Sequence, residues 1–112
     1  MEGPMMPERV TLSVDTSTGA AYIQFTDAPI VETIEETPDI QVDIDATGAV
    51  VGVEVLNLAA ELPVESLTSG YHFRSYDHAV ALSQVKHAIQ SFMYSAGAGQ
   101  AFVPTLQRLQ TV

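Results

Sequence analysis

Three acidic residues are spaced like the ligands of a calcium-binding loop. Asp43, Asp45 and Glu54 occupy the first, third and twelfth positions of that pattern, and Gly48 occupies the sixth. Carboxylate oxygens at this spacing are the ligands that a hard cation such as Ca²⁺ prefers. However, a calcium loop is flanked by helices, whereas apolar and polar residues alternate around Asp43 as they do in a β-strand. We therefore favour a β-hairpin with these acids on its hydrated face, and calcium binding is the alternative.

The three histidines, His72, His78 and His87, are not spaced as metal ligands. His78 and His87 are nine residues apart on a predicted helix, so they face nearly opposite sides and cannot share a metal. His72 lies near Asp77 in the chain, but no close His–His or Glu–His spacing is present. We expect exposed or capping histidines and no cofactor.

Residues for covalent catalysis are also missing from the sequence. The chain has no cysteine and no Gly-x-Ser-x-Gly motif, so neither usual nucleophile stands in its usual setting. The alternating glycines at residues 97–99 follow a predicted helix and do not join a strand to one, which excludes a phosphate-binding loop. We therefore predict no catalytic residues and a protein that is not an enzyme.

The charge balance limits the classes of partner. Fourteen acidic residues stand against four basic ones, which gives a net charge of −10. Nucleic-acid binding depends on Lys and Arg that neutralise phosphates, so we expect no nucleic-acid partner. A basic protein partner is compatible with this charge, because complementary fields steer association.

The sequence also indicates a compartment. No apolar run approaches the roughly 18 residues of a membrane span, and residues 1–8 have neither the basic nor the apolar part of a signal peptide. The absence of cysteine fits a reducing environment. We expect a cytoplasmic protein without a membrane partner, and we expect residues 1–8 to form a flexible arm.

The elements that must position these residues follow from the hydrophobic pattern. Apolar residues recur at every second position over residues 10–14, 21–25, 40–44 and 51–55, which predicts strands with one buried and one hydrated face. Residues 30–36 form a weaker strand whose glutamates do not alternate cleanly, so we expect a bulge or an edge position there.

The parity of the apolar residues predicts which of them face each other. In the second hairpin we expect Ile40 opposite Val55, Val42 opposite Val53, and Ile44 opposite Val51. The same reasoning places Leu12 opposite Ile23 and Val14 opposite Ala21 in the first hairpin, with Gly19 at positive φ in its turn.

After residue 57 the period changes from strand to helix. Residues 58–76 form a linker with short helical turns, and Asp77 is the expected N-cap of a helix over residues 77–96. Leu82, Val85, Ile89 and Phe92 form an apolar stripe on this helix, and residues 97–112 form a tail. The predicted fold is a single α+β domain over residues 9–112: an antiparallel β-meander of about five strands over residues 9–57, with one long C-terminal helix packed on one face.

Three consecutive segments resemble a bacterial family. They are the sequences VDTSTGAAYIQF (14–25), DAPIVET (27–33) and VDIDATGAVVGVEVLN (42–57). Together they resemble the domain-of-unknown-function family 2283 over about residues 10–60, and the C-terminal half lies outside the resemblance. The resemblance implies a small β-rich protein of unassigned activity, and some members encoded beside toxin-like proteins suggest a role in neutralising a partner.

The C-terminal half carries more apolar surface than one sheet face covers. The residues concerned are Phe92, Met93, Tyr94, Phe102, Leu106 and Leu109. We interpret them as a self-association interface, most simply that of a homodimer.

These observations favour a small acidic protein that acts as a non-catalytic protein-interaction module and as an oligomer. One alternative is an antitoxin-like neutraliser of a basic partner protein. The other is a metal-binding, small-ligand-binding or hydrolytic protein that uses Asp43, Asp45 and Glu54.

Overall fold

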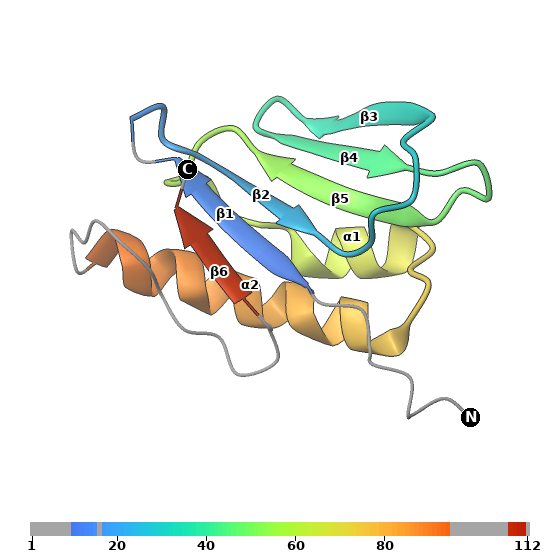
Figure 1. Ribbon diagram of the computed structural model, residues 1–112. Coiled ribbons are helices and arrows are strands. Elements are labelled where there is room, and N and C mark those ends of the chain that lie inside the picture. The colour runs from blue at the N-terminus through green and yellow to red at the C-terminus, as the bar shows by residue number, and fades with distance from the viewer. Residues whose placement is uncertain (1–9, 16, 95–107, 112) are drawn as a thin grey trace.

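The computed structural model describes residues 10–15, 17–94 and 108–111, and these build one sheet with two helices on the same face (Figure 1). The strands are β1 (Thr11–Asp15), β2 (Ala20–Gln24), β3 (Glu32–Thr37), β4 (Ile40–Ile44), β5 (Val50–Val55) and β6 (Arg108–Thr111). The helices are α1 (Val64–Gly70) and α2 (Tyr76–Tyr94). The predicted α+β class is confirmed, since β1 to β5 are antiparallel and a long C-terminal helix covers one face.

The order of the strands differs from that of a simple meander. It runs β3-β4-β5-β2-β1-β6, so the β1–β2 hairpin pairs with β5 and not with β3. This order puts apolar β5 at the centre of the sheet and leaves β3, with its glutamates, at one edge. Charged residues are tolerated at an edge and costly at the centre, which is the physical reason for the arrangement.

The predicted registers are largely confirmed. Leu12 pairs with Ile23 and Val14 with Ala21, while Ile40 and Val42 pair with Val55 and Val53. The pairing of Ile44 is a correction, because a register shift after Asp43 places Ile44 opposite Val50 and not opposite Val51. The shift accommodates the turn at residues 45–49, in which Gly48 has a φ of 85°.

Strand β3 was expected to have a bulge or an edge position, and it has both. It pairs with β4 alone in the described sheet, and its register shifts between Glu35 and Thr37. By contrast, β6 was not predicted. Its four residues pair with β1 in parallel, and a run this short has no readable alternation.

The start of α2 corrects the predicted N-cap. Ser75 precedes the helix, and its hydroxyl accepts a hydrogen bond of 3.0 Å from the backbone N–H of Asp77. Asp77 therefore lies in the first turn, where a carboxylate favours the helix dipole but does not cap the chain. None of the described helices is long and apolar enough to cross a membrane.

The core lies between the sheet and the two helices. Leu82, Val85 and Ile89 from the predicted stripe of α2 are buried with the inward residues of the strands. At one end, the ring of Phe25 meets the rings of Phe73 and His78 at centroid distances of 5.5 and 5.4 Å. The opposite face of the sheet is covered by neither helix (Figure 1).

Candidate functional site

The uncovered face of the sheet, here called the outer face, carries a network of hydrogen bonds between side chains of β2, β3 and β4. The hydroxyl of Tyr22 on β2 donates a hydrogen bond of 2.7 Å to a carboxylate oxygen of Asp43 on β4. The other carboxylate oxygen of Asp43 accepts a hydrogen bond from the hydroxyl of Thr33 on β3. Both oxygens of this carboxylate therefore have a hydroxyl donor, which holds the side chain in one orientation.

Tyr22 reaches Asp43 only because the strand between them carries Gly52. A Cβ atom at Gly52 would lie 2.1 Å from the hydroxyl oxygen of Tyr22 and 2.8 Å from the carbonyl oxygen of Ile23. The phenol thus crosses β5 directly over the glycine, where any side chain would block it. An isolated glycine inside a strand is a known sign of such a close approach.

Burial and the neighbouring carboxylates raise the pKa of the Tyr22 phenol well above its usual value of 10. Burial is the largest cause, followed by the hydrogen bond to Asp43 and the negative charges of Asp43 and Glu54. The phenol is therefore a permanent donor at neutral pH. It cannot serve as a general base there.

The outer positions of β1 to β5 are polar and negatively charged. The registers align Ser13, Tyr22, Glu54, Gln41 and Glu35 in one row, and Thr11, Gln24, Gly52, Asp43 and Thr33 in the next. With Asp15 at the end of β1, the outer positions of these five strands carry four acids and no Lys or Arg.

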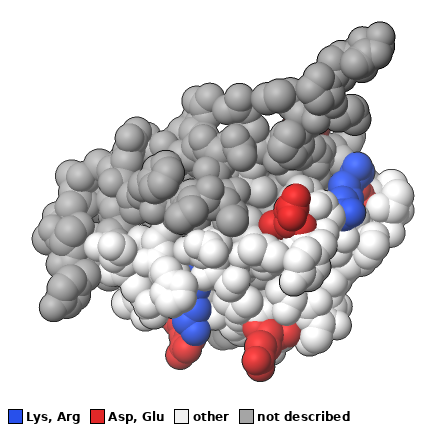
Figure 2. Space-filling view, turned by 90° about the horizontal axis from the view of Figure 1, so that it is seen from below, with Lys and Arg blue, Asp and Glu red and all other residues white. Residues whose placement is uncertain are grey.

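The helix side of the molecule differs from this face. Figure 2 shows that its described surface is mostly uncharged, with isolated acidic and basic side chains. The two basic side chains that the structure describes are paired: Arg74 lies 2.8 Å from Asp45, and Lys86 lies 3.3 Å from Glu61. Four of the six acids of β1 to β5 therefore lie on the outer face, and the other two, Glu32 and Glu36, lie on the edge strand β3.

The calcium-like spacing belongs to a β-turn that Asp45 organises. One oxygen of Asp45 accepts hydrogen bonds from the backbone N–H groups of Thr47 and Ala49 and from the Thr47 hydroxyl, at 2.6–3.0 Å. Arg74 donates to its other oxygen. The Thr47 hydroxyl and the Arg74 guanidinium hold the pKa of Asp45 well below its usual range, so the residue is ionised at neutral pH.

The structure does not bring the three candidate ligands together. Asp45 was expected on the hydrated face, but it is buried with 4% exposure in the turn, whereas Asp43 and Glu54 lie on the outer face. The correction follows from the end of β4: alternation holds only along a strand, and Asp45 lies one residue beyond it. Among residues 10–15, 17–94 and 108–111, no three His, Asp or Glu side chains form a group that could hold a metal ion.

The histidines have two kinds of environment. His72 and His87 are exposed, and the His72 carbonyl accepts a hydrogen bond of 2.8 Å from the backbone N–H of Val50. His78, which was expected to be exposed or capping, is buried at 3% exposure against Phe25. It lies on the inner side of the first turn of α2, so it acts as a core residue.

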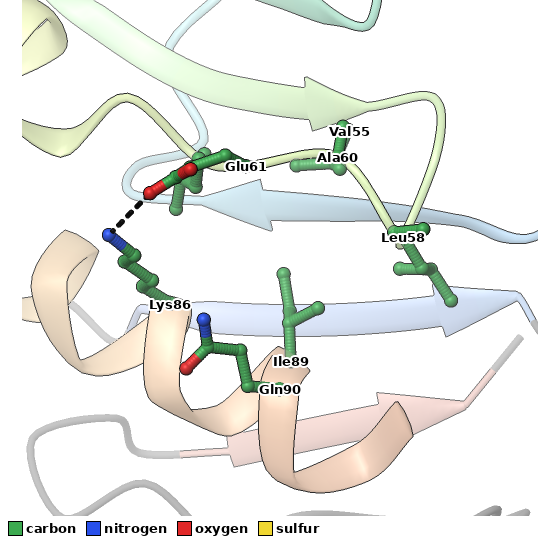
Figure 3. Close-up of a pocket in the computed structure, with 9 residues that line it drawn as sticks. Val55, Leu58, Ala60, Glu61, Lys86, Ile89 and Gln90 are labelled. Carbon is green, nitrogen blue, oxygen red and sulfur yellow. Dashed lines mark hydrogen bonds and ion pairs between the residues drawn. The ribbon is translucent and has the colours of Figure 1, made fainter. Parts of the chain in front are cut away.

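A cavity of about 430 Å³ opens between α2 and the loop at residues 57–62 (Figure 3). Its buried apolar wall consists of Val55, Leu58, Leu62 and Ile89. The polar part of its lining consists of Glu61, Lys86 and Gln90. The ion pair between Lys86 and Glu61 connects the helix to the loop at this site.

The predicted self-association residues are not tested by the structure. Phe102 and Leu106 lie outside the described residues. Phe92, Met93 and Tyr94 are placed only as backbone at the end of α2, and Leu109 only as backbone in β6 beside Leu12.

Sequence reasoning missed two arrangements. Arg74 was not linked to Asp45, because 29 residues separate them and no local pattern joins them. The Tyr22–Asp43 contact was also missed, although Gly52 within an apolar strand was a readable signal.

A family model matches the part of the chain that forms β1 to β5. The model of the family described as "Protein of unknown function (DUF2283)" matches residues 12–58, which confirms the resemblance over that segment. The match runs from β1 to three residues past β5, so this segment is similar to a family of unknown function, and both helices lie outside it. No curated protein and no solved structure matches the chain.

Proposed function

We propose that the protein is a non-catalytic protein-interaction module of the cytoplasm that binds a partner with a basic surface through the outer face. The observation that carries this proposal is the uncovered sheet face with Asp15, Glu35, Asp43 and Glu54 and no basic residue at the outer positions of β1 to β5. Such a face attracts a basic protein and repels nucleic acid.

The geometry supports binding at this face more than catalysis there. Asp43 has both carboxylate oxygens engaged by hydroxyl groups, and Tyr22 remains protonated at neutral pH. A fixed network of this kind gives a rigid, pre-ordered surface, which reduces the entropy lost on association. Neutralisation of a basic toxin-like protein is one form that such binding takes, and the resemblance to family 2283 is its support.

The test compares two charge reversals of the same kind. Glu54→Lys changes the outer face, and Glu65→Lys changes an exposed acid on α1. We expect wild type and Glu65→Lys to capture the same basic protein from native extract, and Glu54→Lys to lose it. The capture should weaken as salt is raised, because exposed charges are screened.

Equal capture by all three proteins would place the binding surface elsewhere. Binding that is insensitive to salt would contradict the role of charge. Once a partner is captured, its identity is compared with the product of the neighbouring gene, which tests the neutralising role.

We also propose that the module acts as a homodimer through the apolar residues of the C-terminal half, Phe92, Met93, Tyr94, Phe102, Leu106 and Leu109. Light scattering at tens of micromolar measures the mass directly. A monomer at that concentration would refute this part of the proposal and leave the outer face unaffected.

A further inference from the structure

We propose that the cavity between α2 and residues 57–62 binds an amphipathic monocarboxylate, with its carboxylate at Lys86 and its apolar chain against Val55, Leu58, Leu62 and Ile89. This site is on the helix side of the sheet, so the inference is independent of the proposed outer-face function. Its volume of about 430 Å³ lies in the lower part of the roughly 300–1,000 Å³ range of small-molecule sites, which favours a medium-length chain.

The lining separates into an apolar part and a polar part. Leu62 and Ile89 are buried at 4% and 6% exposure, and they continue the apolar wall that Val55 and Leu58 begin. Ile89 points from the helix toward the sheet, whereas Lys86 lies at the edge of the site (Figure 3). A ligand that fits both parts has an apolar body and one polar end.

The polar end is defined by an ion pair that already places a carboxylate at Lys86. The Glu61 carboxylate lies 3.3 Å from Nζ of Lys86, but its side chain is 77% exposed, whereas that of Lys86 is 32% exposed. Glu61 thus occupies the position of an anion without being held firmly, since an exposed pair of this kind contributes little. A ligand carboxylate that enters with a buried chain can replace it.

Gln90 supplies a second polar group beside Lys86. The two residues are four positions apart on α2, so they lie on the same face of the helix, and both line the cavity. The amide N–H₂ of Gln90 is a donor for the second oxygen of a carboxylate. Lys86 is the only lysine in the chain, so no other lysine ammonium group competes for the ligand.

The experiment uses the full chain and the series hexanoate, octanoate and decanoate, with octanol and octylamine as head-group controls. Calorimetric titration below micelle-forming concentrations gives each Kd. We expect each added methylene to tighten binding about fourfold, which corresponds to about 0.8 kcal/mol per buried methylene, until the cavity is filled. Octylamine should bind at least tenfold more weakly than octanoate.

Three variants separate this site from non-specific association. Lys86→Met should weaken octanoate binding at least tenfold and leave octanol unchanged, and Lys86→Arg should retain octanoate. Glu61→Gln should tighten octanoate binding several-fold, because it removes the competing carboxylate. Glu65→Gln is the matched control, since it removes one negative charge from an acid that does not line the cavity.

The outcome for Glu61→Gln is decisive. If Glu61→Gln and Glu65→Gln tighten binding equally, the effect is one of net charge and the head-group assignment is wrong. If wild type binds no member of the series, or binds octylamine as well as octanoate, the proposal is overturned. Thermal melting of each variant verifies that the fold is kept; Glu61 and Glu65 are exposed, and Lys86 is half-buried.

Discussion

Gly52→Ala should destabilise the protein by far more than its size suggests. The new methyl group would lie 2.1 Å from the Tyr22 hydroxyl oxygen and 2.8 Å from the Ile23 carbonyl oxygen, so the phenol must leave its position over β5. Its hydrogen bond of 2.7 Å to Asp43 is then lost.

The magnitude follows from three contributions. Overpacking costs about 1–3 kcal/mol. Loss of a hydrogen bond to a charged group costs about 1.5–3 kcal/mol, and the lower half applies because Asp43 is partly exposed. The lower conformational entropy of the unfolded chain offsets about 0.4–1 kcal/mol of this loss of stability. We therefore expect a loss of about 1.5–5 kcal/mol, a large part of the roughly 5–15 kcal/mol that stabilises a domain.

Urea denaturation measures the change, provided that the slope of the transition stays constant. Gly70→Ala is the control, because a Cβ there meets nothing within 4 Å. With no clash, only the gain of about 0.4–1 kcal/mol from the less flexible unfolded chain remains, so we expect no loss of stability. In the Tyr22→Ala background the cost of Gly52→Ala should fall by at least about 1 kcal/mol, because the two shortest contacts, both with the Tyr22 side chain, are removed. Equal transitions for wild type and Gly52→Ala, or a cost independent of Tyr22, would refute the reasoning.

Three further predictions concern ionisation and assembly. The pKa of Asp45 is lowered in the folded state, so its contribution to stability is present above about pH 4 and is lost as the pH falls below that value. Asp45→Asn should therefore flatten the acid limb of a plot of Tm against pH. An unchanged acid limb would contradict this prediction. Burial and the adjacent Glu36 raise the pKa of Tyr71 from 10 to about 12, so its contribution to stability is present below about pH 10 and is lost as the pH rises toward 12. Tyr71→Phe should therefore flatten the alkaline limb of the plot of Tm against pH. The absorbance of wild type at alkaline pH should show that the Tyr71 phenol titrates late. Leu106→Asp should shift the mass measured by light scattering toward that of the monomer and leave the sheet intact. Gln41→Lys on the outer face should change neither the mass nor the fold. If Gln41→Lys alone lowered the mass, the interface would have to lie on the outer face.

The sequence by itself determined strands β1 to β5, the registers within the two predicted hairpins apart from that of Ile44, and the covering helix α2. The reason is that local alternation specifies which side of each strand is buried, and a slip of one residue would expose a whole apolar row. Thus the period of the apolar residues alone places Val42 opposite Val53, and Leu82 and Val85 on the buried side of a helix.

Only the tertiary structure decided how these pieces were joined. The pairing of β2 with β5, the link between Arg74 and Asp45, and the passage of Tyr22 over Gly52 join residues that lie far apart in the chain. No local period encodes such contacts. They arise because charged β3 is tolerated at the edge, because buried Asp45 needs a compensating cation, and because a glycine leaves room for a neighbouring ring.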